Sequence, residues 1–247
     1  MITQLPYCGT PPAPGTLLER FNLDPVLIFS LVALAGWHLR SVRGRAALGA
    51  TCIGWGIVAA ALLSPLCALS VALFSARIGQ HMILSLCAAP VLATTLPELS
   101  VAAARRSLWT STLMFFLALW FWHMPAPYEA TFTSTPVYWA MHLTLFGSAL
   151  ALWRALLRSP REVGVDLLIA GAVTSMQMGF LGAILTTASR PLYFRHLATT
   201  QVWGLTPLQD QALGGVFMWV PGIVLFLAAA LYALQRMRSL VTGPRMA

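Results

Sequence analysis

Residues 46–64 read AALGATCIGWGIVAAALLS, an apolar run that contains no charged side chain. A helix of about 20 mostly apolar residues spans the hydrocarbon core of a bilayer. Six more runs of this kind lie at 23–40, 76–96, 108–124, 136–157, 166–187 and 211–234. The sequence therefore predicts an all-α, polytopic membrane protein whose bundle has seven transmembrane helices.

The composition supports this prediction and excludes other classes of protein. Of 247 residues, 58% are hydrophobic and 9% are charged, whereas soluble domains carry about 25% charged residues. All 15 cationic residues are arginine, which excludes chemistry that needs a lysine Schiff base. We interpret the net charge of +8 through the membrane topology and expect a lipid bilayer, not nucleic acid, as the partner.

The arginines predict the orientation of the bundle. With the N-terminus outside, 11 of the 15 arginines fall on the cytoplasmic side, where basic residues are enriched. We therefore expect an extracytoplasmic N-terminal arm at 1–22, a transmembrane domain at 23–236 and a cytoplasmic tail at 237–247. Within the sixth run, small residues repeat every four positions and predict close contact with another helix; they are Gly171, Ser175, Gly179 and Ala183.

Histidines inside the predicted spans are the main functional candidates, because ionisable groups are costly in a bilayer. His81 lies about 8 Å below the outer end of its span, at about 1.5 Å per residue. His142 lies at a similar depth, and His123 ends the fourth span on the same side. Cys67, just beyond the second span, and Asp210, just before the seventh, belong to the same outer layer.

Imidazole binds both oxidation states of copper, and soft sulfur ligands favour Cu(I). The sequence therefore predicts a copper site at His81, His123 and His142, with Cys67 and Asp210 as further candidate ligands. The common hydrolase, P-loop and dinucleotide-binding motifs are not found, so we expect no enzymatic activity.

The surroundings of this layer give further expectations. Arg77 stands one turn before His81 and is expected to pair with Asp210, to hold an acidic partner or to extend outward to water. His196, in the loop at 188–210, and His38, at the inner end of the first span, are expected to be solvated. Two of the four cysteines lie within apolar runs, so we expect no disulfide framework.

Three sequence blocks are specific when taken together. They are SPLCAL at 64–69 with FSARIGQHM at 74–82, WFWHMPAPY at 120–128, and WGLTPL at 203–208 with MWVPG at 218–222. Over nearly the whole chain they resemble the CtaG-type cytochrome c oxidase assembly factors. The family's histidines fall on His81, His123 and His142, whereas Arg77 occupies the place of a further histidine that the family often has.

This resemblance implies a multi-pass protein of the bacterial inner membrane that assembles a haem–copper oxidase and delivers copper to it. Cytochrome c oxidase subunits and periplasmic copper chaperones would then be its partners. Two alternatives stay open at this point. One is a transporter of copper or another small solute, suggested by Met176 and Met178 in the sixth span, and the other is a haem-binding redox protein with histidine axial ligands.

Overall fold

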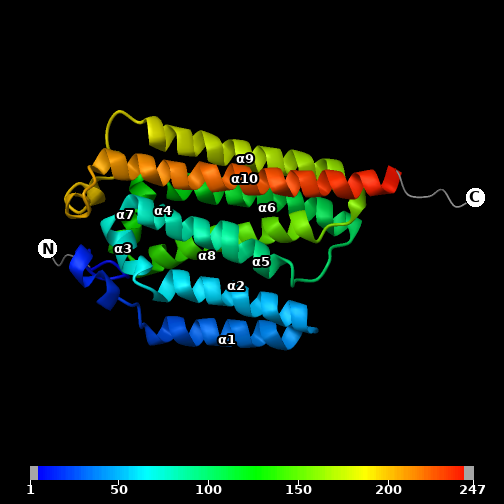
Figure 1. The fold of residues 1–247 in the computed structure, drawn as a ribbon, viewed down its shortest axis with the longest axis horizontal. Coiled ribbons are helices and arrows are strands. Elements are labelled where there is room, and N and C mark those ends of the chain that lie inside the picture. The colour runs from blue at the N-terminus through cyan, green and yellow to red at the C-terminus, as the bar shows by residue number, and fades with distance from the viewer. Residues whose placement is uncertain (1–4, 242–247) are drawn as a thin grey trace, which may run out of the picture.

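The structure is a computed structural model that describes residues 5–241. Within that part the chain is helical and contains no strand, and Figure 1 shows its long helices side by side. The helices are α1 (Pro25–Ser41), α2 (Arg45–Leu63), α3 (Leu66–Ala72), α4 (Phe74–Met82), α5 (Ala89–Ala93), α6 (Val101–Trp122), α7 (Pro125–Thr133), α8 (Thr135–Leu157), α9 (Gly164–Thr187) and α10 (Pro207–Val241). A π-helix, η2 (Ile83–Ala88), joins α4 to α5, and short 3-10 helices lie at Pro14–Glu19, Arg161–Val163, Phe194–His196 and Gln201–Trp203.

Five of the helical segments in the described part are long and apolar enough to cross a membrane: Arg45–Leu63, Phe74–Ala93, Thr135–Leu157, Gly164–Thr187 and Pro207–Tyr232. The prediction of seven spans is therefore established only in part. Helix α1 is apolar but shorter, with 17 residues, and α6 includes Arg105 and Arg106 in its first two turns. Each of the seven predicted runs nevertheless lies largely in a helix.

Local sequence explains where several helices begin. The side chain of Asp24 accepts a hydrogen bond from the backbone N–H of Val26, at 2.9 Å, and Pro25 occupies the first helical position of α1. Ser100 caps α6 through the N–H of Ala103. Between α1 and α2 the chain reverses at Gly44, whose φ of 91° is one that L side chains rarely adopt.

The segment α4–η2–α5 runs through the middle of the bundle. It packs against α2, α8 and α10, and Figure 1 shows α1 and α2 on one side of it and α9 and α10 on the other. It is the most buried of the five candidate spans. The protein therefore shields the most polar span with its neighbours, because polar groups facing lipid would be costly.

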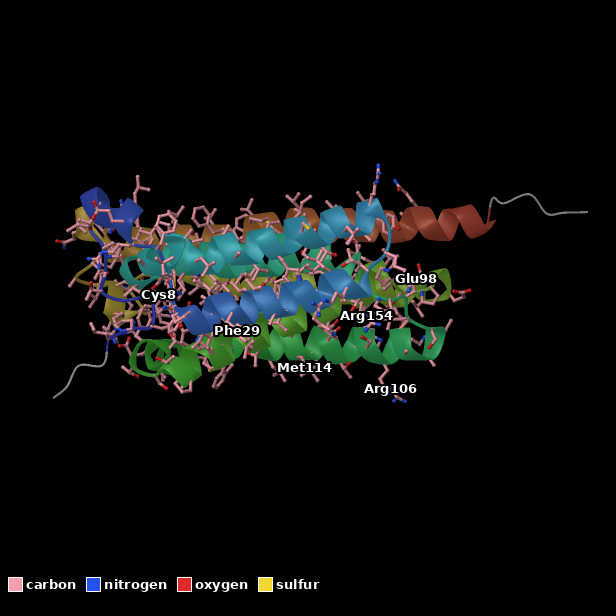
Figure 2. The ribbon with its side chains drawn as sticks, turned by 90° about the horizontal axis from the view of Figure 1, so that it is seen from below. Cys8, Phe29, Glu98, Arg106, Met114 and Arg154 are labelled. Carbon is pink, nitrogen blue, oxygen red and sulfur yellow. A yellow bond between two sulfur atoms is a disulfide. The ribbon has the colours of Figure 1, made fainter. Side chains whose placement is uncertain are left out.

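The two ends of the bundle differ in chemistry. Figure 2 shows Cys8 at one end, whereas Glu98, Arg106 and Arg154 lie at the opposite end. At the Cys8 end are α3, α7 and the 3-10 helices of the last long loop (Figure 1). The opposite end carries the connections between α1 and α2, between α5 and α6 and between α8 and α9, of which the first and the last contain arginine.

Close packing between α9 and α10 uses other glycines than the predicted stripe. A Cβ added at Gly171 or Gly179 would meet no atom within 4 Å. A Cβ at Gly182 would lie 2.8 Å from Trp219, and one at Gly215 would lie 2.7 Å from the carbonyl oxygen of Gly182. The glycines of the predicted stripe, Gly171 and Gly179, therefore do not contact another helix closely, and that part of the prediction is wrong. The close approach of the α9 and α10 backbones occurs instead at Gly182 and Gly215.

The N-terminal arm is attached to the bundle over its described residues. The ring of Tyr7 stacks on Tyr138, with centroids 4.8 Å apart, and its hydroxyl donates to Asp24 at 2.5 Å. Burial and the hydrogen bond to this carboxylate raise the pKa of Tyr7. At the other end of the chain, α10 extends to Val241, past the predicted start of the tail at 237, and 242–247 lie outside the described residues.

Candidate functional site

Three histidines from three different helices meet in one buried layer near the Cys8 end. His81 lies in α4, His123 is the C-cap residue of α6, and His142 lies in α8. His81 and His142 each stand seven residues after the first residue of their helix, about 10 Å into the bundle. The His81 ring lies 5.4 Å from the His142 ring and 6.0 Å from the His123 ring, between centroids.

The hydrogen bonds of these rings leave several nitrogens free. Nδ1 of His123 lies 2.5 Å from the carbonyl oxygen of Leu119, and Nδ1 of His142 lies 3.1 Å from that of Tyr138. Because a carbonyl only accepts, Nδ1 carries the proton in both rings and Nε2 keeps its lone pair. Both Nε2 atoms, and both ring nitrogens of His81, are buried without a hydrogen-bond partner.

An unpaired buried polar atom costs about 1–3 kcal/mol, so four in one layer are unusual for a structural core. The rings do not yet form a coordination shell, because no three His, Cys, Asp or Glu side chains in residues 5–241 are arranged to hold a metal ion. The arrangement provides nitrogen lone pairs that a cation, a proton or a hydrogen-bond donor can use.

Cys67 is placed beside this layer but in a different chemical state from the one expected. It forms a disulfide with Cys8, 59 positions earlier in the chain, although the sequence analysis expected no disulfide framework. The bond joins the N-terminal arm to the start of α3. A disulfide sulfur has no thiolate, so Cys67 is not a copper ligand in this form.

Tyr138 connects the disulfide to the histidines. Its hydroxyl lies 3.3 Å from Sγ of Cys8, and its ring lies 4.3 Å from the ring of His142, between centroids. The same residue supplies the carbonyl that orients His142. The sequence analysis did not identify Tyr138, although its position one turn before His142 was a signal that the two share a helix face.

Asp210 lies away from the three rings and caps α4. Its carboxylate accepts hydrogen bonds from the backbone N–H groups of Phe74 and Ser75, at 2.7 and 3.0 Å, and from the hydroxyl of Ser75 at 2.5 Å. Three donors and the N-terminal end of a helix stabilise a carboxylate. Asp210 therefore fixes the helix that carries His81, and it does not point to the histidine layer as a ligand.

Arg77 is buried, with 1% of its surface exposed, so the expectation that it extends outward to water is wrong. Its guanidinium donates to the carbonyl of Ser70 and, at 2.6 Å, to the hydroxyl of Thr131, and it lies 4.0 Å from the centroid of Phe132. No carboxylate in residues 5–241 forms an ion pair with it, Asp210 included. A buried positive charge therefore stands one turn from His81, balanced mainly by aromatic faces.

His196 is also buried, and the expectation of a solvated loop residue is corrected. Its Nδ1–H donates to the carbonyl oxygen of Ala72, at 3.2 Å, and its Nε2 accepts from the hydroxyl of Tyr128, at 2.7 Å. Burial and, to a smaller extent, the positive charge of Arg77 together lower the pKa of His196 to about 3. Both ring nitrogens are used, so His196 attaches the last long loop to α3 and α7.

A comparison with protein-family models shows which family the chain belongs to. The model of the cytochrome c oxidase caa3 assembly factor family, Caa3_CtaG, matches residues 31–239. The chain belongs to this family. No curated protein and no solved structure gave a match. The expected membership is therefore confirmed, and all three histidines lie within the region that the family model covers.

Proposed function

We propose that this member of the assembly factor family binds copper at His81, His123 and His142 and passes it to a haem–copper cytochrome c oxidase during assembly. The observation that carries this proposal is the set of buried imidazole nitrogens without partners. Copper is here a cargo, and oxidase subunits and periplasmic copper chaperones are the proposed acceptors and donors.

The spacing of the rings fits a shared ion. With metal–nitrogen bonds of about 2.0 Å, two imidazoles on one ion at tetrahedral or trigonal angles have centroids about 5–5.5 Å apart. His81 and His142 are 5.4 Å apart, and His81 and His123 are 6.0 Å apart. No hydrogen bond restrains the His81 ring, so it can rotate to direct a lone pair toward either of its two neighbours.

The charge around the cluster favours a monovalent ion. The three imidazole ligands are neutral, Asp210 is used by α4, and Arg77 adds a positive charge one turn away. Imidazole accepts either oxidation state of copper, and the Arg77 charge repels a divalent ion about twice as strongly as a monovalent one, so it weakens the binding of any cation and favours Cu(I). A weakly held ion can be released, which is what a delivery protein requires.

We further propose that seven helices span the bacterial inner membrane, with the N-terminus outside and the C-terminus in the cytoplasm. The arginine distribution supports this orientation. The Cys8–Cys67 disulfide supports it independently, because such bonds persist on the oxidising side of the membrane. The histidine layer then lies near the outer face, and a cavity of about 430 Å³ between α1, α2 and α8 reaches His142 from Asp24.

A Cu(I) titration of the purified protein against a competing chromophoric chelator tests the proposal. Single alanine substitutions at His81, His123 and His142 are each expected to lower the affinity at least tenfold. His38→Ala is the matched control, because His38 is a buried histidine in the last turn of α1, outside the histidine layer. Equal Cu(I) affinity in the wild type and the three cluster variants would reject the copper site.

A test in cells separates binding from delivery. In a strain that depends on this protein for its oxidase, the three cluster variants are expected to reach the membrane at normal levels while oxidase copper content falls. Normal oxidase copper in variants that no longer bind Cu(I) would refute delivery and leave only a scaffolding role in assembly.

The transporter alternative loses the residues that suggested it. Met176 is 76% exposed on the outer surface of α9, whereas Met178 is fully buried against Gly222 of α10. The two methionines face different environments and do not form one path through the bundle. We therefore propose the assembly role in preference to transport.

A further inference from the structure

A second cavity lies at the arginine-rich end of the bundle, far from the histidine layer. It has a volume of about 670 Å³ and is enclosed by α1, α2, α8, the end of α5 and the connections that follow α1 and α5. Its lining includes Arg43 and Arg158 together with His38, Trp55, Leu92 and Leu150. Nothing in the proposed copper function uses this cavity.

The inner wall of this cavity is fixed by a chain of hydrogen bonds. The indole N–H of Trp55 donates to Nδ1 of His38 at 3.2 Å, so the proton of His38 is on Nε2 and donates to the hydroxyl of Thr95 at 3.1 Å. The Thr95 hydroxyl in turn donates to the carbonyl of Leu92. His38, expected to be solvated, is instead buried, and its ring shapes the wall without a free donor for a ligand.

The two arginines keep binding capacity. Arg43 is exposed and forms no ion pair within the described part of the chain. Arg158 donates through Nε to the carbonyl of Leu96, and its Nη2 lies 3.4 Å from Glu98. Because the Glu98 side chain is 77% exposed, this pair is weak and competes poorly with a stronger anion.

Both long walls change from apolar to cationic in the same direction. Along α1 and its end, the lining runs from Leu34 through Trp37 and His38 to Arg43, and along α8 it runs from Leu150 to Arg158. Arg158, the C-cap residue of α8, follows Leu150 by eight positions, which correspond to about 12 Å along the helix. The cavity is therefore amphipathic, with its cationic rim at the end of the bundle and its apolar part deeper within the bilayer region.

We propose that this cavity binds one anionic phospholipid, whose phosphate interacts with Arg43 and Arg158 and whose first acyl carbons lie beside Leu34 and Leu150. Guanidinium groups recognise phosphate oxygens through two parallel hydrogen bonds, and basic pockets between transmembrane helices bind anionic headgroups. A free phosphate ion shares the oxyanion chemistry but leaves the apolar part of the cavity unfilled, so the lipid is the ligand that uses the whole cavity.

Native mass spectrometry of the purified full chain with added lipid tests the proposal. Phosphatidylglycerol is expected to bind the wild type with one saturable site and at least tenfold more tightly than phosphatidylcholine. The double variant R43Q/R158Q is expected to bind phosphatidylglycerol at least tenfold more weakly, since each tenfold corresponds to about 1.4 kcal/mol. The control is R106Q, which removes one positive charge at the same end but outside this cavity.

Two further measurements keep the result interpretable. Inorganic phosphate should compete with phosphatidylglycerol only weakly; competition at equal concentration would overturn the lipid assignment in favour of a phosphate ion. Circular dichroism and the Cu(I) titration should be unchanged in R43Q/R158Q, which separates this site from the copper proposal. An equal loss of phosphatidylglycerol affinity in R106Q and R43Q/R158Q, or no loss in either variant, would refute the proposed lipid site.

Discussion

Removal of the Cys8–Cys67 disulfide is expected to lower the stability of the protein substantially. The two cysteines are 59 positions apart. In the chain-entropy model, a crosslink that closes a loop of about 60 residues stabilises the folded state by about 4 kcal/mol at 25 °C. For a protein of this size, 1 kcal/mol shifts the melting temperature by about 2–4 °C. The variant Cys8→Ser should therefore melt roughly 10 °C below the wild type in the same detergent.

The assay measures melting of wild type and Cys8→Ser without reductant, together with labelling by a maleimide before and after reduction. Unreduced, denatured wild type should take up two labels, on Cys52 and Cys87, and reduced protein should take up four. Cys52→Ser is the control, since Cys52 is exposed and forms no crosslink. Four labels without reduction, or equal melting of Cys8→Ser and Cys52→Ser, would refute the reasoning.

Three other changes have defined outcomes. The ring centroid of Tyr138 lies 5.8 Å from Cζ of Arg77 and 4.3 Å from the ring centroid of His142, so the Arg77 guanidinium lies within about 10 Å of the His142 ring. Repulsion between two like unit charges at that distance costs about 1.7 kcal/mol at an effective dielectric constant of 20. Arg77→Met should therefore tighten Cu(I) binding about tenfold in the chelator titration. Arg195→Met is the control, because Arg195 forms an ion pair with Glu129, and it should change the Cu(I) affinity less than twofold. Unchanged affinity in Arg77→Met would argue against repulsion at the site. The pKa of His196 is about 3 when folded and about 6.5 when unfolded, so its neutral form stabilises the fold fully above pH 6.5 and this contribution is lost as the pH falls toward 3. Melting temperature should thus fall between pH 7 and pH 5, and His196→Gln should make this slope shallower; an identical slope would contradict the burial argument. Gly215→Ala places a methyl group 2.7 Å from the Gly182 carbonyl and should lower the melting temperature by several degrees, whereas Gly171→Ala, with open space, should not.

The sequence was sufficient to bring the three histidines to one layer, because depth along a helix depends only on residue count and direction. Alternating helix directions place His81 and His142 at equal depth once the ends of their helices are known. Which way each ring points depends on the rotation of each helix about its axis, and residue count does not provide it.

The remaining features of the site depend on contacts between distant segments. Cys8 reaches Cys67 across 59 positions, and Asp210 reaches Phe74 across 136. Neither contact follows a helical period, so apolar patterning could not reveal it. Arg77 shows the same limit: a membrane arginine near a helix end normally extends to water, but the rings of α7 and α8 around it make burial favourable here.

The cap that Asp210 places on α4 has a consequence for the biogenesis of the protein. The α4 segment contains Arg77, Gln80 and His81, which makes it a poor candidate for independent insertion into lipid. Its first backbone amides find their acceptor only in α10, the last of the described helices to be synthesised. A nascent chain that stops before α10 would therefore expose this segment without its carboxylate, and quality-control proteases should remove such a product.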